Sequence, residues 1–208
     1  MREGWRRLSV ADAAAMVKRG RAPVYAEAGG ELVFNQKCVR DGRVDDRLAR
    51  RTDVTKRQVP EWAWVQPGDT LVNSTGRGTV GRAGFVRSLA DRATADSHLT
   101  IVRPKPTVVV PDYLGILLHS AKDELEGMAS GSTNQTELSA DSILAIPILL
   151  PPLEEQRRIV DLIAAVDDQA STADSLATTL RALRTALLAD LLSGDHEIPA
   201  SYDELLSA

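Results

Sequence analysis

The stretch PPLEEQRRIVDLIAAVDDQASTADSLATTLRALRTALLADLLSG, residues 151–194, decides the fold of this chain. After its two opening prolines it holds no further proline, and no glycine until Gly194, and such breakers are tolerated at the two ends of a helix. Glu154 and Glu155 stand near the start, where acidic side chains interact favourably with the helix dipole. The stretch predicts one helix of about 42 residues, roughly 60 Å long at about 1.5 Å per residue.

An apolar seam with the seven-residue period of a coiled coil runs along this helix. Gln169 stands inside the seam, where a polar residue would help to specify register and partner. The alternative is a long helix packed along its own domain, but a rod of roughly 60 Å is about twice the diameter of a small domain. The residues expected at a helix–helix interface are Ile159, Leu162, Val166, Leu176, Leu180, Leu183 and Leu187.

The composition is that of an ordinary soluble protein. The chain has 208 residues, enough for one domain with an appendage, and is 43% hydrophobic and 26% charged. The single cysteine, Cys38, excludes an internal disulfide and a cysteine zinc cluster. No apolar run reaches about 18 residues, and the N-terminus lacks the apolar core of a signal peptide. We therefore expect a cytoplasmic protein without a membrane segment, metal site or cofactor of its own.

Charge is divided unevenly along the chain. Residues 1–110 hold 20 lysines and arginines against 12 acidic residues, a net charge of +8, whereas residues 111–208 hold 5 against 17, a net charge of −12. A basic first half favours a polyanionic partner such as nucleic acid, although a solvated basic surface would have the same composition. The acidic C-terminal helix is expected to avoid nucleic acid and to contact protein.

The first half predicts a short helix followed by strands. Residues 10–19 are rich in alanine and precede a glycine, which favours a helix. Strands are expected within residues 31–39, over Thr70–Asn73 and over residues 83–86. The polar residues 43–60 between them form either a basic face or a solvated surface helix.

The second half predicts a helix, a loop and an edge strand before the long helix. Residues 111–126 have the pattern of an amphipathic helix, and residues 127–139 are polar and rich in glycine. Residues 143–150 are apolar but contain a proline, which confines a strand to the edge of a sheet. His98 has no metal-spaced partner, so a structural role is expected for it.

The loop STGRGTVGR, residues 74–82, is the most informative part of the first half. Its glycines allow close approach of the backbone to a ligand, and its hydroxyl groups can bind phosphate oxygens. Arg77 and Arg82 can form two parallel hydrogen bonds with a phosphate or a guanine edge. The loop is therefore a candidate for contact with nucleic acid.

This loop admits three other interpretations. Gly76, Gly78 and Gly81 match the spacing of a dinucleotide-binding fingerprint, but that motif opens a helix, and a strand is expected here. A P-loop is rejected because Arg82 and Ala83 replace the required lysine and hydroxyl residue. A hairpin whose glycines serve only the turn remains open.

Two further segments resemble a known family. GSTNQTELS at 131–139, followed by IPILLPPLEEQRRIVDLI at 146–163, is similar to the end of a target-recognition domain in type I restriction-modification specificity subunits, which closes on an I-P-x-P-P-L-x-E-Q-x-x-I signature. The loop at 74–82 follows a G-D-x-L motif at 68–71, as in those domains. The resemblance covers residues 21–194.

The resemblance implies a mixed α/β target-recognition domain, residues 1–150, followed by a long C-terminal coiled-coil helix, residues 151–194, and a tail, residues 195–208. It implies a non-catalytic subunit that directs an adenine methyltransferase subunit, and in some systems a restriction nuclease-translocase subunit, to double-stranded DNA. S-adenosylmethionine would belong to the methyltransferase. Full-length members carry two halves in tandem, whereas this chain has one, so a homodimer, or pairing with another half or with a different partner, is expected.

Candidate contact residues follow from the loop and the basic half. A rival hypothesis is a coiled-coil scaffold of a phage-defence system whose recognition domain binds protein, and another is a nucleotide-binding enzyme that uses the loop. Salt-dependent duplex binding would separate the first rival from DNA recognition, and binding of a nucleotide alone would favour the second. The predicted DNA contacts are Asn73, Ser74, Thr75, Arg77, Thr79 and Arg82, with Lys37, Arg40, Lys56, Arg57, Arg103 and Lys105 as phosphate contacts.

Overall fold

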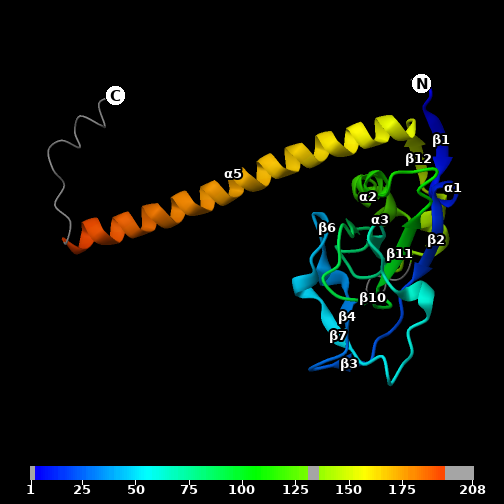
Figure 1. The fold of residues 1–208 in the computed structure, drawn as a ribbon, viewed down its shortest axis with the longest axis horizontal. Coiled ribbons are helices and arrows are strands. Elements are labelled where there is room, and N and C mark those ends of the chain that lie inside the picture. The colour runs from blue at the N-terminus through cyan, green and yellow to red at the C-terminus, as the bar shows by residue number, and fades with distance from the viewer. Residues whose placement is uncertain (1–2, 131–135, 195–208) are drawn as a thin grey trace. The chain divides into compact units, whose positions relative to one another are not determined.

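The computed structural model describes residues 3–130 and 136–194 (Figure 1). The chain divides into two compact units, Met1–Val160 and Asp161–Ala208. The predicted tail at 195–208 lies outside the described residues. Within the described part, no helix is long and apolar enough to span a lipid bilayer.

A six-stranded mixed sheet organises the first unit. Its strand order is β2-β11-β8-β9-β6-β5, with antiparallel neighbours throughout except for the parallel pair β6 and β9. The central strand β8 is buried along its whole length, as expected for a strand covered on both faces. The bounds are β2 Ala14–Arg19, β5 Val39–Arg40, β6 Gly42–Val44, β8 Thr70–Asn73, β9 Ala83–Phe85 and β11 Leu99–Pro104.

Two smaller sheets complete the strands of this unit. A four-stranded sheet has the order β10-β4-β7-β3, and β1 pairs antiparallel with β12 from the end of the unit. Single turns of 3-10 helix connect some of the strands. The bounds are β1 Arg6–Ser9, β3 Tyr25–Ala26, β4 Glu31–Phe34, β7 Arg50–Thr52, β10 Ala93–Ala95, β12 Pro147–Leu150, η1 Gln36–Cys38, η2 Asp46–Leu48 and η3 Glu61–Ala63.

Two hydrophobic cores lie on opposite faces of the six-stranded sheet, because successive side chains of a strand alternate between faces. Leu71 and Ile101 contribute to one core, and their neighbours Val72 and Val102 contribute to the other. The second core is covered by short helices, which place Leu114 and other apolar residues on the sheet. These helices are α1 Val10–Ala13, α2 Pro111–Ser120, α3 Lys122–Gly127 and α4 Ala140–Ala145.

The predicted helix over residues 10–19 is wrong beyond its first turn. Val10–Ala13 is helical, but Ala14–Arg19 is strand β2, paired antiparallel with β11. Alanine favours helix by less than about 1 kcal/mol per residue, and pairing with an already buried strand outweighs that preference. Local composition therefore misled the prediction where a distant strand supplied the hydrogen bonds.

The other predicted elements hold with altered limits. The strands at Thr70–Asn73 and at the start of 83–86 are confirmed, whereas residues 43–60 contain β6, η2 and β7 rather than a surface helix. The helix expected over 111–126 is divided into α2 and α3 at Ala121. In the apolar segment expected as a strand over 143–150, the first residues belong to α4, and only Pro147–Leu150 is extended.

The long helix is confirmed as α5, Leu153–Ser193, a single helix of 41 residues that ends before Gly194 at a φ of 78°. Its first two turns belong to the first unit, because Gln156 is 1% exposed and its Oε1 accepts a hydrogen bond of 2.8 Å from the Val110 amide. Ile159 packs partly buried against the same unit's core, so it does not share the exposure of the remaining seam. From Leu162, 66% exposed, to Leu187, 50% exposed, the seam side chains face solvent.

Candidate nucleic-acid interface

The loop at residues 74–82 leaves β8 and returns directly to β9. The amide of Gly81 donates to the carbonyl oxygen of Asn73 at 2.8 Å, and the amide of Asn73 donates to the carbonyl oxygen of Arg82 at 2.8 Å. These two hydrogen bonds close the base of the loop. At the tip, the amide of Val80 donates to the carbonyl oxygen of Gly76 at 2.9 Å. These backbone hydrogen bonds therefore hold the loop in a defined shape.

Glycines in this loop allow close packing of neighbouring segments. Gly81 has a φ of 81°, and a Cβ at this position would stand 2.7 Å from the carbonyl oxygen of Lys122 in α3. Gly76 has a φ of 94°, and its Cβ would stand 2.9 Å from the Nε2 atom of Gln36. Both positions favour glycine for their backbone conformation, and Gly81 also requires it for space, because a Cβ there would meet backbone atoms of α3. The glycine spacing thus serves the loop itself, and β9 follows it, in agreement with the rejection of a dinucleotide fingerprint.

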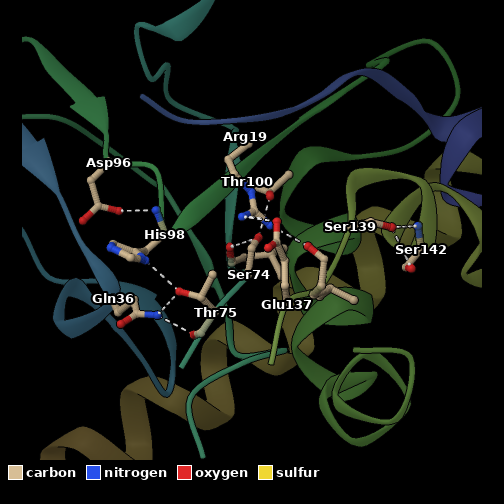
Figure 2. A network of polar contacts seen from close by, with 12 residues as sticks. Arg19, Gln36, Ser74, Thr75, Asp96, His98, Thr100, Glu137, Ser139 and Ser142 are labelled. Carbon is tan, nitrogen blue, oxygen red and sulfur yellow. Dashed lines mark hydrogen bonds and ion pairs between the residues drawn. The ribbon is translucent and has the colours of Figure 1, made fainter. Parts of the chain in front are cut away.

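Thr75 is held by two residues from distant segments (Figure 2). Its Oγ1 atom lies 2.8 Å from Nδ1 of His98 and accepts a hydrogen bond of 2.9 Å from Nε2 of Gln36, which also donates to the Thr75 carbonyl oxygen. His98 thus has a structural partner, as expected. Sequence reasoning missed Gln36 because the residues around it do not indicate that η1 lies against this loop.

Two predicted contacts, Asn73 and Ser74, are buried and hold the base of the loop. Both are 0% exposed. The Ser74 hydroxyl lies 2.5 Å from that of Thr100 in β11, and the Asn73 Nδ2 atom donates to the Gln36 carbonyl oxygen at 3.4 Å. In this conformation neither side chain reaches a surface where DNA could bind. The prediction of direct contacts at these two positions is corrected to a supporting role.

The side chain of Arg19 holds residues 137–138 beside residues 74–75 of the loop at 74–82, and we call this contact the Arg19 clamp. Arg19 of β2 pairs with Glu137 at 2.8 Å and donates to the carbonyl oxygen of Leu138 at 2.8 Å (Figure 2). The Leu138 amide in turn donates to the carbonyl oxygen of Ser74 at 2.8 Å. The loop is therefore braced from both sides, by η1 and by residues 137–138.

A buried carboxylate supports His98 through its backbone. Asp96 is 3% exposed, and its Oδ1 atom accepts a hydrogen bond of 2.8 Å from the His98 amide (Figure 2). Burial raises the pKa of the Asp96 carboxyl, and the hydrogen bond from His98 opposes the shift only in part. The folded protein therefore holds a proton at this position more readily than the unfolded chain does.

Replacing this carboxylate gives a prediction for stability against pH. A carboxyl whose pKa is raised by folding contributes full stability below its unfolded pKa, about 3.9, and that contribution is lost as the pH rises through the folded pKa. Asp96→Asn keeps an oxygen acceptor without the charge, so its free energy of unfolding relative to wild type should increase from acid to neutral pH. Urea unfolding of both proteins at several pH values from acid to neutral measures this difference in the free energy of unfolding.

The matched control for this prediction has the opposite sign. Hydrogen bonds from Thr55 lower the pKa of the half-buried Asp53 carboxyl, so Asp53→Asn should lose stability relative to wild type as the pH rises. A pH-independent difference between Asp96→Asn and wild type would contradict the assignment of Asp96 as a carboxylate destabilised by burial.

The structure places four of the predicted cationic contacts, and Thr79, in the loop or close to it. Arg77 is exposed in the loop, and Lys37 is exposed beside Gln36. Arg40 and Arg82 line one surface hollow of about 450 Å³, together with Asp41, Ala83, His119 and Lys122. Thr79 is half-buried, with its hydroxyl bonded to the Gly76 carbonyl oxygen at 3.1 Å.

The remaining predicted phosphate contacts have other partners. Arg103 donates to both carboxylate oxygens of the buried Asp69, at 2.9 and 2.8 Å, so its guanidinium already has an ion-pair partner, and its assignment as a phosphate contact stays a prediction. Lys105 donates to carbonyl oxygens at the end of α1. Lys56 pairs with Asp53 at 3.7 Å. Arg57 donates to the Ala22 carbonyl oxygen at 2.7 Å, and none of these contacts involves the loop.

Comparisons with known proteins agree with this geometry. The family model for the type I restriction modification DNA specificity domain matches residues 57–178, which defines the class of the molecule as a DNA-recognition domain. Because the match covers more than half of the chain, the chain belongs to this family. The resemblance seen in residues 131–139 and 146–163 is thereby confirmed. Specificity subunits are the non-catalytic, DNA-recognising components of type I systems.

Individual relatives are distant and longer. The type I restriction enzyme HindI specificity subunit of Haemophilus influenzae is 27% identical over 126 residues, which are 59% of this chain and 27% of that protein. A putative MjaX specificity subunit of Methanocaldococcus jannaschii is 21% identical over 92% of this chain and 46% of its own length. The chain thus spans less than half of the curated relatives that it matches.

Among solved structures, the HsdS subunit from Thermoanaerobacter tengcongensis has the same fold. Its TM-score is 0.66 at 18% identity, covering 96% of this chain and 52% of that one. At this identity the likeness concerns the fold alone, and it confirms the α/β domain followed by a long helix.

Proposed function

We propose that this chain is a non-catalytic specificity module that reads duplex DNA with the loop at residues 74–82. The observation that carries the proposal is the exposed Arg77 in a loop held in one shape by Gln36, His98 and the Arg19 clamp. A fixed loop loses little conformational entropy on binding, and an arginine can form two hydrogen bonds with a guanine edge in the major groove. Family membership supports DNA as the ligand.

The predicted effect of Arg77→Ala is a loss of sequence discrimination. Binding to a duplex selected from a random pool should weaken by roughly 1–3 kcal/mol for each base contact removed, with relaxed selectivity at one position of the site. Titrations of the selected duplex and of singly substituted duplexes measure both effects.

Arg77→Lys is the matched control, because lysine keeps the charge but lacks the planar fork. It should preserve the salt dependence of binding and still lose selectivity. Unchanged affinity and selectivity in Arg77→Ala would place base reading outside the loop.

The proposed partner is an adenine methyltransferase subunit, which would bind S-adenosylmethionine, and in some systems a restriction nuclease as well. The named relatives are subunits of type I restriction enzymes, which supports this role. Mapping methylated adenines in a genome with and without this gene tests it. Disappearance of methylation at one motif is the expected result, and an unchanged methylation pattern would contradict the assignment.

We further propose that two copies pair through α5. The exposed seam beyond Leu162 supports this assembly, since soluble monomers avoid long apolar stripes. Antiparallel pairing would place two identical reading domains at opposite ends of a rod, and such symmetry would be mirrored in a bipartite, palindromic site. The rival function, a coiled-coil scaffold that binds protein, requires the same seam but predicts no salt-dependent duplex binding.

A further inference from the structure

A surface hollow lined by basic side chains lies at the base of the loop at residues 74–82. It has a volume of about 450 Å³ and is lined by Arg40, Asp41, Arg82, Ala83, His119 and Lys122. These residues come from three places in the sequence: the β5–β6 hairpin, the end of the loop with the start of β9, and the helices α2 and α3. The fold thus gathers basic side chains that lie far apart in the chain.

The walls of the hollow are positioned by local contacts. Arg82 donates from Nη2 to the carbonyl oxygen of Gly78 at 3.0 Å, and Arg40 donates from Nε to that of Lys37 at 3.0 Å. A guanidinium has five donors, so each arginine retains others for a ligand. Lys122 pairs with Glu126 at 2.8 Å, which orients its ammonium group.

One acidic residue, Asp41, shares the hollow with these cations. Asp41 and Gly42 are the two central residues of the β5–β6 hairpin, with φ values of 48° and 74°. This is the backbone of a type I′ turn, which accepts Asn-Gly as readily as Asp-Gly. The His119 ring lies against the same turn, because a Cβ on Gly42 would stand 3.4 Å from it. The turn therefore does not require the Asp41 carboxylate, and Asp41→Asn would change the charge of the hollow without changing the turn.

We infer that this hollow binds a phosphodiester of the DNA backbone and so sets the position of the loop on the duplex. The inference rests on the proposed DNA-binding function and extends it to a site with a different role. Arg40, Arg82 and Lys122 line the hollow together with Asp41, and because Lys122 pairs with Glu126 and Asp123, the two arginines carry most of its positive charge. The hollow adjoins the loop through Arg82, so a strand contacted by the loop would pass beside it. Contacts of this kind fix register and orientation without reading sequence. His119 and Lys122 join the interface, although neither stands out in the sequence.

The test measures binding of the full chain to a duplex of randomised sequence at several salt concentrations. Arg40→Gln combined with Lys122→Gln should reduce the slope of log affinity against log salt by about one for each phosphate that is no longer neutralised. Arg82 is left unchanged because its hydrogen bond to Gly78 shapes the loop. The matched control is Arg6→Gln with Arg7→Gln, which removes two exposed charges from β1 and should change the slope less.

Asp41→Asn is the second variant, and it should gain affinity. Removing one negative charge from the hollow should tighten binding roughly two- to fivefold, the range of an exposed ion pair, for all sequences alike. A gain cannot arise from misfolding, so this variant keeps the test informative if the double variant is unstable.

The outcomes separate the two proposals. Absence of salt-dependent binding by the wild type would overturn the proposed function itself. Normal wild-type binding with unaltered slope and affinity in the hollow variants would overturn the inference alone. Titration with inorganic phosphate, followed by NMR of the His119 ring, adds a third arm. If phosphate perturbs His119 while the variants leave duplex binding unaltered, the hollow takes a free anion and the inference is wrong.

Discussion

Replacing Leu180 and Leu183 with Asp is expected to convert a dimer of this chain into monomers. Both side chains belong to the seam and are 54% and 62% exposed in the single chain. In the proposed pair they would be buried against the partner helix, where an unpaired carboxylate costs several kcal/mol. Light scattering should report twice 22.5 kDa for the wild type and 22.5 kDa for the variant at micromolar concentration.

The control variant places the same two charges on the opposite side of the helix. Thr178 and Thr185 lie away from the seam, and each hydroxyl bonds to a carbonyl oxygen of α5 itself, that of Asp174 and that of Arg181. Thr178→Asp with Thr185→Asp should remain dimeric. A wild-type mass of 22.5 kDa, with no second half supplied, would exclude the homodimer and leave a different partner for the seam.

The largest expected loss of folding stability follows from Arg103→Met. Asp69 is 1% exposed, and the guanidinium of Arg103 donates to both of its oxygens and to the Trp64 carbonyl oxygen at 2.8 Å. Removing the arginine leaves a buried carboxylate without its counter-charge, which costs about 3–5 kcal/mol. Urea unfolding of the full chain measures the loss.

Two controls make this stability result specific. Asp69→Asn combined with Arg103→Met removes both charges and should recover part of the loss, because the remaining amide carries no charge to desolvate. Lys105→Met removes a cation with exposed hydrogen bonds and should cost less than about 1 kcal/mol. A loss below about 1 kcal/mol in Arg103→Met would show that solvent screens the Asp69 carboxylate, contrary to its burial.

The interface illustrates how far residue type predicts function. The chemistry of Arg40, Arg77 and Arg82 predicts contact with DNA, and the structure places all three on or beside the loop. The same reasoning selects Asn73 and Ser74, but they belong to the buried base. A polar side chain next to a glycine turn has the same appearance in sequence whether it faces solvent or a neighbouring strand.

The sequence by itself determined the elements whose physical cause is local. The long helix follows from its lack of internal breakers and its seven-residue period, and the Asp41–Gly42 turn follows from the positive φ values that this dipeptide tolerates. The resemblance to the family followed from the signature around Pro151 and Pro152, and this signature lies within the residues that the family model matches.

Only the tertiary structure decided the features that depend on distant partners. Ala14–Arg19 is a strand because β11 lies beside it, although its alanines favour helix. Gln36, His98, His119 and Lys122 lie at the loop or at the hollow beside it, because the fold brings η1, the residue before β11, and the helices α2 and α3 to this place. Such contacts are set by the packing of segments far apart in the chain, and the free energy of that packing exceeds local conformational preferences.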